Sequence, residues 1–407
     1  MKKLLFCYID GMDLRRVDEA KTSFIFNSLK SYPWIKISSP TSIDGLPTLL
    51  TGALPSEHGF FGIKLRPGSC RTLATKLIDG LPDVINTSIQ CMFHLLYSSY
   101  DLPAIPPKRR RNFEILRTVQ NREYRRTENL LQFGGLKSLL GAIGLENCRY
   151  LYSRASEPLK DLIDNIGSGK YIFEFVHLYS FDLFQRWNID DEKRTQAVYG
   201  CFDSFVRGIY EKCNNNDITL LLFSDHGYDK IRGYINLKER LRMLGLSEEE
   251  YTFFIELSMA RFWFFSDRAR DRIVRMLREI PNSEFFFWKD LQQFNISLTG
   301  PQYGEAFIMS FPGFAFFPHD FHHPIANLFL GIADRKQRPR LLNPRHRGDH
   351  SLLPNFDAAK GFMILFDSGY EASRQEIDLM DVSPSLLELL GLKKPDSMKG
   401  NAVFKVR

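Results

Sequence analysis

Short apolar runs that each end in a polar residue and a turn recur along the chain. Four of them are "LLFCYIDG" at 4–11, "YIFEFVHLYSFD" at 171–182, "ITLLLFSDHG" at 218–227 and "GFMILFDSG" at 361–369. Apolar runs of this length are typical of strands buried on both faces, as in a parallel sheet. Helical patterns lie between them, for example at 191–213. The alternation predicts an α/β fold, a three-layer sandwich with a mostly parallel central sheet.

Four polar residues follow these runs at the predicted strand ends: Asp10, Asp182, Asp225 and His226. In open α/β sheets, ligands bind beyond the carboxyl ends of the strands. A buried carboxylate or imidazole is costly to desolvate unless a partner such as a divalent cation compensates it. A plain turn with a capping Asp explains Asp225 and His226 taken alone. Convergence of all four on one edge favours a metal site.

The predicted core runs over 1–235 and 331–407, with an insertion at about 66–165 that has few clear strands. This insertion contains the basic segment "PPKRRRNFEILRTVQNREYRR" at 106–126. A solvated helical face is the simpler interpretation of that segment, and an anionic partner is the alternative.

A second inserted region, 236–330, is predicted to form a cap or lid, because it lies between two candidate site motifs. It contains two Phe-rich stretches, at 251–267 and 307–323. Packing inside the cap explains these aromatic residues most simply. An apolar wall for the part of a substrate away from its phosphate is the alternative.

Composition narrows the class of protein and its setting. The net charge is +6, from 54 basic and 48 acidic residues, a mild excess that suits an anionic substrate and does not specifically indicate nucleic acid. The six cysteines form no CxxC pair, which favours reduced thiols and a cytoplasmic location. No apolar run of about 18 residues occurs, so no membrane span is expected. Nothing in the sequence indicates an oligomeric state.

Five motifs occur in a fixed order along the chain. Asp10 follows the first predicted strand, and "PTSIDGLPTLLTG" with "ALPSEHG" begins at position 40. "SDHGYDK" begins at 224, "RGDHS" at 347 and "DVSPSLLELLGLKKPDSMKG" at 381. Together they resemble the alkaline phosphatase superfamily, and most closely its type I phosphodiesterase/nucleotide pyrophosphatase branch.

The resemblance implies a two-metal site. Family members hold two divalent ions, usually zinc, so one or two ions per chain are expected. One position would use Asp10, the nucleophile, Asp225 and His226, and the other Asp182 and His350. One ion would help to ionise the nucleophile, and both would stabilise charge on the transferring group and the leaving oxygen.

The same resemblance identifies the nucleophile by its spacing to Thr51 and Gly52. The spacing indicates Ser42, a predicted metal ligand as well, while its neighbour Thr41 remains open. Two turn hydroxyls that cap the next helix are the structural alternative. His58 in "SEHG" is interpreted as a structural residue that closes a turn.

Two positions depart from the family pattern. Arg186 stands where the family has a histidine ligand, and Gly45 stands where nucleotide pyrophosphatases often have an asparagine that donates to a phosphoryl oxygen. Arginine stays protonated and offers no lone pair. Three arrangements are open. Another histidine, His177 or His346, could complete the second site, or the second ion could bind weakly. In the third arrangement, the guanidinium replaces that cation and holds a phosphoryl oxygen.

The sequence thus predicts a metal-dependent hydrolase or transferase of small phosphorylated substrates, with phosphodiesters favoured and a covalent Ser42 intermediate. A phosphomonoesterase or sulfatase-like hydrolase is one alternative, although no Cys-x-Pro-x-Arg motif surrounds position 42. A degenerate member that binds a phosphorylated ligand without turnover is the other. Arg186 supports that last interpretation, and the retained ligand set opposes it.

Overall fold

The computed structural model describes most of the chain: 2–39, 45–61, 65–67, 80–97, 113–115, 127–153, 159–167, 170–296, 298, 300, 303–333, 338–350 and 353–407. The two nucleophile candidates, Thr41 and Ser42, lie outside the described residues. The chain divides into two compact units. The first contains Met1–Gly59, Glu123–Lys230 and Leu353–Arg407, and the second contains Phe60–Arg122 and Ile231–Leu352.

The first unit is built on a seven-stranded sheet with the order β20-β2-β18-β9-β1-β8-β7. All neighbouring pairs run parallel except the two pairs that β18 makes. The strands are β1 (Lys3–Tyr8), β2 (Trp34–Ser38), β7 (Cys148–Tyr152), β8 (Phe173–His177), β9 (Ile218–Ser224), β18 (Gly361–Leu365) and β20 (Glu376–Asp378). The prediction of a mostly parallel sheet is confirmed.

Alternate residues of β1 pack on opposite faces of the sheet. Leu5 and Cys7 join a core with α1 (Ser23–Ser31), α8 (Leu159–Asn165), α9 (Ser180–Asn188) and α10 (Glu192–Asn215). On α10, Tyr199, Phe202, Val206 and Ile209 recur at helical spacing and are buried, which explains why this face turns inward. The Asp191 side chain caps the start of α10 by accepting from the Arg194 N–H.

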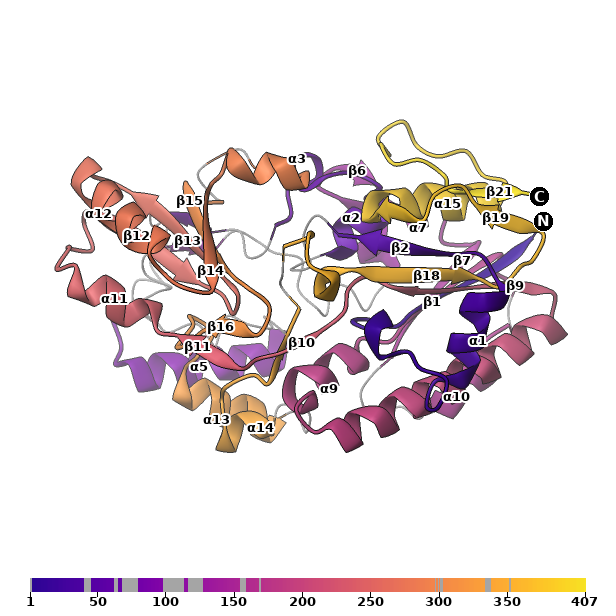
Figure 1. The fold of residues 1–407 in the computed structure, drawn as a ribbon, viewed down its shortest axis with the longest axis horizontal. Coiled ribbons are helices and arrows are strands. Elements are labelled where there is room, and N and C mark those ends of the chain that lie inside the picture. The colour runs from indigo at the N-terminus through magenta and orange to yellow at the C-terminus, as the bar shows by residue number, and fades with distance from the viewer. Residues whose placement is uncertain are drawn as a thin grey trace. The chain divides into compact units, whose positions relative to one another are not determined.

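The opposite face of the sheet is aromatic. Phe6 lies 5.0 Å from Phe175 and 5.2 Å from Phe223, centroid to centroid. Figure 1 shows α2 (Gly45–Thr51), α7 (Leu139–Ile143) and α15 (Val382–Leu389) on one side of this sheet, with α1 and α10 on the other. The predicted three-layer α/β architecture is therefore confirmed in the first unit.

Shorter elements complete the first unit. They are η1 (Leu14–Arg16), α3 (Pro55–His58), η4 (Thr127–Leu130), β5 (Gln132–Phe133), β6 (Leu136–Lys137), β10 (Asp229–Lys230), η7 (Asp357–Ala359), β19 (Tyr370–Ala372), η8 (Leu379–Asp381) and β21 (Phe404–Val406).

The second unit has a separate antiparallel sheet with the order β12-β13-β15-β14. Its strands are β12 (Tyr251–Ile255), β13 (Met259–Phe264), β14 (Ser283–Phe287) and β15 (Ala306–Ser310). Phe253, Phe262 and Ile308 pack with α11 (Leu237–Met243) and α12 (Asp267–Arg278) in one core. Many of the phenylalanines noted in the sequence are thus core residues of this unit.

The other described elements of the second unit are β3 (Leu65–Pro67), α5 (Asp83–Tyr97), β4 (Phe113–Ile115), β11 (Gly233–Ile235), η5 (Asp290–Phe294), β16 (Phe314–Phe316), α13 (Pro324–Ala333), α14 (Pro339–Leu342) and β17 (Gly348–Asp349). Helix α13 packs against α5 and α14. The predicted role of 236–330 as a cap over the site stays a prediction. Among the helices in the described ranges, none is long and apolar enough to cross a membrane.

One local expectation is wrong. The run at 171–182 is not a single strand that ends at Asp182, because β8 ends at His177 and α9 begins at Ser180. Asp182 therefore lies in the first turn of a helix. The apolar run continued across this boundary because Leu178 and Phe181 are both fully buried.

Candidate metal centre

The loops that follow β1 and β9 meet at the carboxyl edge of the first unit's sheet. The two strands are parallel neighbours, with Tyr8 opposite Phe223. The next residues along each strand bring together the buried side chains of Asp10, Asp225 and His226. One ligand atom from each of these three lies within 4.8 Å of the others. Two carboxylates and one imidazole form a donor set that suits a divalent cation such as zinc.

The His226 ring is held in a defined orientation. Its Nδ1 lies 3.0 Å from the Gly227 carbonyl oxygen, which can only accept a hydrogen bond. Nδ1 is therefore protonated and donates to this oxygen, and Nε2 faces the carboxylates. Nε2 lies 3.5 Å from Asp10 Oδ1 and 3.4 Å from Asp225 Oδ2. A backbone carbonyl on the far nitrogen is the usual arrangement for a histidine that ligates a metal.

Asp10, Asp225 and His226 are buried together, and the pKa of each is shifted by its neighbours. Burial raises the pKa of Asp225 to about 6, against the opposing charge of His226. Burial alone would lower the pKa of His226, but the charges of Asp225 and Asp10 raise it to about 10. Burial alone would raise the pKa of Asp10, but hydrogen bonds from His177 and His226 hold it below its usual range. Two neighbouring buried carboxylates thus favour a positive charge beside them.

Two glycines allow the loops to approach this closely. Gly11 has φ +78, and a Cβ there would lie 3.2 Å from His226 Cε1 and 3.1 Å from Tyr228 Cε2. A Cβ on Gly227 would lie 2.8 Å from Asp13 Cγ. The Asp-Gly and His-Gly pairs of the sequence therefore have a packing reason.

His177, at the end of β8, orients Asp10. Its Nε2 lies 3.1 Å from Asp10 Oδ2, and its Nδ1 lies 2.9 Å from the Tyr150 hydroxyl. The ring stacks on Tyr8 with 4.4 Å between centroids. His177 was a candidate to replace the missing ligand, but it contacts the outer oxygen of Asp10. Oδ1, which faces His226, stays available to a cation.

Asp182 is held by two partners of its own. The Tyr228 hydroxyl donates to Oδ1 at 2.6 Å, and Arg186, one turn later on α9, donates to Oδ2 at 3.2 Å. Burial raises the pKa of Asp182, although the charge of Arg186 opposes this shift. Burial alone would lower the pKa of Arg186, but Asp182 holds it well above its usual value. Arg186 is therefore a cation paired with the predicted metal ligand.

Helix α2 begins beside the cluster of Asp10, Asp225 and His226 side chains. A Cβ on its first residue, Gly45, would lie 3.6 Å from Asp225 Oδ2. The helix leads to His58, whose Nε2 lies 3.0 Å from the Thr48 hydroxyl in a buried contact. This contact agrees with the structural role expected for His58. The predicted ligands Asp10, Asp225 and His226 are thus brought together, whereas His346 and His350 belong to the second unit and their part in the site stays a prediction.

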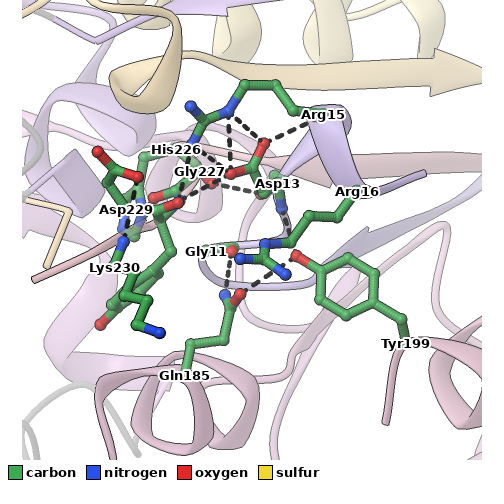
Figure 2. A network of polar contacts seen from close by, with 12 residues as sticks. Gly11, Asp13, Arg15, Arg16, Gln185, Tyr199, His226, Gly227, Asp229 and Lys230 are labelled. Atoms are coloured by element: carbon green, nitrogen blue, oxygen red, sulfur yellow. Dashed lines mark hydrogen bonds and ion pairs between the residues drawn. The ribbon is translucent and has the colours of Figure 1, made fainter. Parts of the chain in front are cut away.

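Several residues around the cluster were not singled out by the sequence analysis. Figure 2 shows Asp13, Arg15, Gln185 and Tyr199 in one polar network with Gly11 and the loop of His226. The segment "DLRR" at 13–16 and Gln185, three residues after Asp182, belong to no recognised sequence motif. Tyr228 could have been found from the sequence, because it adjoins the recognised motif "SDHG".

The fold as a whole was compared with known proteins. Murine ectonucleotide pyrophosphatase/phosphodiesterase 5, in an inactive variant in complex with AMP, matches with a TM-score of 0.66 and 11% identity. The match covers 99% of this chain and 97% of that one. The chain has the fold of a nucleotide pyrophosphatase/phosphodiesterase. The resemblance read from the five motifs is confirmed at the level of the fold.

Two further structures agree with this match. The same murine protein in another structure has a TM-score of 0.65 at 12% identity, with 99% of this chain and 97% of that chain covered. Human ectonucleotide pyrophosphatase/phosphodiesterase 5 has a TM-score of 0.63 at 11% identity, with 98% of this chain and 97% of that chain covered. No protein-family model matches the chain, and no curated protein matches its sequence.

Proposed function

We propose that the chain is a divalent-metal-dependent hydrolase or transferase of phosphate esters, with small phosphodiesters as its substrates and Ser42 as its nucleophile. The observation that carries the proposal is the buried group of Asp10, Asp225 and His226 at the carboxyl edge of a sheet with the phosphodiesterase fold. The AMP complex of the murine protein supports a nucleotide-like ligand. A cytoplasmic location remains part of the proposal.

Asp10, Asp225 and His226 Nε2 would hold the cation. When bound, a divalent ion would lower the pKa of a coordinated hydroxyl and stabilise charge on phosphoryl oxygens. Ser42 lies three residues before Gly45, the residue beside Asp225, and its oxygen would attack phosphorus. The bond from phosphorus to the leaving alkoxide would break, the alkoxide would take up the proton that Ser42 lost, and a phosphodiester between Ser42 and the retained group would remain. Water or a second alcohol would then attack phosphorus, break the bond to the Ser42 oxygen and return a proton to it, which restores the serine hydroxyl.

The guanidinium of Arg186 would replace the second metal ion. Its guanidinium already neutralises Asp182, and a planar fork suits a phosphoryl oxygen. It supplies charge without activating a water molecule, so the leaving group must be a good one. The same residue favours the second candidate function, in which the chain binds a phosphorylated ligand without turnover.

Elemental analysis of the purified protein, combined with chromogenic substrates, separates these functions. We expect bound metal, turnover of bis(4-nitrophenyl) phosphate, and slower turnover of 4-nitrophenyl phosphate and 4-nitrophenyl sulfate. Ser42→Ala should abolish turnover and retain the metal, while Thr41→Ala serves as the matched control. A fall for Thr41→Ala alone moves the nucleophile to Thr41. Bound metal without turnover of any substrate supports the binding-only alternative, and a protein without metal contradicts both.

A further inference from the structure

An ion pair between a buried carboxylate and a half-exposed arginine lies between the two loops that carry Asp10 and His226 (Figure 2). Asp13, three residues after Asp10, is 1% exposed, and its Oδ1 accepts from the backbone N–H and the Nε of Arg15 at 2.9 and 3.0 Å. Its Oδ2 accepts from Arg15 Nη2 at 2.7 Å. Such a forked pair is both stronger and more directional than a single hydrogen bond.

This pair also forms hydrogen bonds to the other loop, through the backbone of Tyr228. The Tyr228 N–H donates to Asp13 Oδ2 at 3.3 Å, and Arg15 Nη2 donates to the Tyr228 carbonyl at 2.8 Å. Tyr228 comes two residues after His226, and its hydroxyl donates to Asp182. One ion pair therefore fixes the loop of His226 and, through Tyr228, the carboxylate of Asp182.

The loop after β1 is fixed from behind as well. The Asp13 N–H donates to the Tyr199 hydroxyl at 3.1 Å, and that hydroxyl donates to Gln185 Oε1 at 3.2 Å. Gln185 Nε2 donates to the Gly11 carbonyl. Side chains of α9 and α10 thus tie the backbone on both sides of Met12, and Asp13 is held from both directions.

We propose that Asp13 and Arg15, the interloop clasp, are positioning residues that set the affinity of the Asp10, Asp225 and His226 cluster for a divalent cation. The proposal rests on the proposed function. Before a cation binds, repulsion between Asp10 and Asp225 favours separation of their loops, against the attraction of each carboxylate to His226. The clasp prevents this separation, so the ligands stand in place when the cation arrives. Outer partners of metal ligands typically change metal affinity by about 10–100-fold.

The test compares three variants of the full chain. Asp13→Asn keeps the shape of the side chain and removes its charge, and Arg15→Met keeps the stem of the half-exposed arginine and removes its fork. Arg16→Met is the matched control, because Arg16 is the next residue but pairs with Glu192 at the surface, at 3.2 Å. The probe is Co²⁺ alone, followed by its absorption spectrum and by competition with a chelator.

We expect Asp13→Asn and Arg15→Met each to weaken Co²⁺ binding by about 10–100-fold and to speed its dissociation. The double variant should be little worse than either single one, because both changes break the same contact. Arg16→Met should bind Co²⁺ within about twofold of the wild type, as expected for an exposed pair.

Equal Co²⁺ affinity in the wild type, Asp13→Asn and Arg15→Met overturns the clasp and leaves the proposed metal site intact. Variants that lose thermal stability in the presence of EDTA but keep the Co²⁺ affinity of the wild type also overturn it, since the pair would then be only structural. A wild type that binds no Co²⁺ overturns the proposed metal dependence and the clasp with it. If Asp13→Asn does not fold, Arg15→Met decides alone.

Discussion

Arg186 is the residue that separates this chain most clearly from a two-metal enzyme. It stands one helical turn after Asp182, and its Nη2 lies 3.2 Å from Asp182 Oδ2. The other oxygen of Asp182 accepts from Tyr228, so both oxygens have protein partners. A carboxylate with these partners has less need of a cation than the buried Asp10 and Asp225, whose shared positive partner is His226.

Arg186→His should therefore change the number of bound ions. Histidine offers a neutral ligand nitrogen and frees Asp182 from its paired charge. We expect about one tightly bound ion per chain in the wild type and about two in the variant, counted by elemental analysis after dialysis. Arg194→His, which changes an exposed arginine in the first turn of α10, is the control. Two tight ions in the wild type would falsify the replacement of a cation by guanidinium.

His177 acts on a neighbouring residue rather than on the cation. His177→Phe keeps the ring that stacks on Tyr8 and removes the hydrogen bond to Asp10 Oδ2. Asp10 then loses one of the two histidines that lower its pKa. We expect Zn²⁺ to bind about 10–100-fold more weakly, measured by chelator competition. Tyr150→Phe, which removes the hydrogen bond to the far nitrogen of His177, should have a smaller effect, and an effect of equal size would contradict this order.

The loops after β1 and β9 show how the elements build the site. Parallel strands deliver both loops to the same edge, but their contact depends on Gly11 and Gly227, which have no Cβ. A methyl group on Gly227 would lie 2.8 Å from Asp13 Cγ and 3.0 Å from the Ala358 carbonyl oxygen. The Asp13 carboxylate is held by Arg15 and by the Tyr228 N–H, and the Ala358 oxygen is backbone, so the loop itself would have to move.

Gly227→Ala should destabilise the protein and disturb the metal cluster together. Overpacking of this kind costs about 1–3 kcal/mol in the free energy of unfolding, measured by chemical denaturation. Gly200→Ala is the matched control: it lies inside α10, and its Cβ would meet only the Lys21 carbonyl oxygen at 3.4 Å. There the same substitution should stabilise by up to about 1 kcal/mol. A Gly227→Ala variant as stable as Gly200→Ala would refute the close approach.

At the scale of the whole molecule, charge is unevenly divided. Basic residues outnumber acidic ones in the second unit, whereas acidic residues are in slight excess in the first. The cluster of Asp10, Asp225 and His226 belongs to the first unit, so the excess of positive charge that could attract an anion to the molecule lies in the second. A phosphodiester carries one negative charge, and attraction of this kind acts over a distance that salt limits.

The activity should therefore depend on salt through substrate capture. We expect kcat/KM for an anionic diester to fall severalfold between about 20 and 200 mM NaCl, since the screening length is about 10 Å at 0.1 M. The value of kcat should hold nearly constant, because the bound complex is already formed. A kcat/KM that does not change over this range would contradict capture by the basic unit.

The sequence by itself determined the layout of the first unit and the ligands on its main edge. Apolar runs alternating with helical patterns specify a buried parallel sheet, and parallel strands place their carboxyl ends at one edge. Asp10, Asp225 and His226 are therefore expected at the same edge, although their close contact depends on the loops. At Asp182 the same reasoning failed, because a short apolar run looks alike whether it is a strand or the buried start of a helix.

Tertiary structure alone decided which side chains surround those ligands. His177 meets Asp10, and Asp13 meets Tyr228, across separations of 167 and 215 residues. Such contacts depend on strand order, register and the close approach of two glycines, and none of these leaves a periodic signal in the chain. Local pattern follows from the chemistry of neighbouring residues, whereas a polar network depends on where the packed elements bring distant residues together.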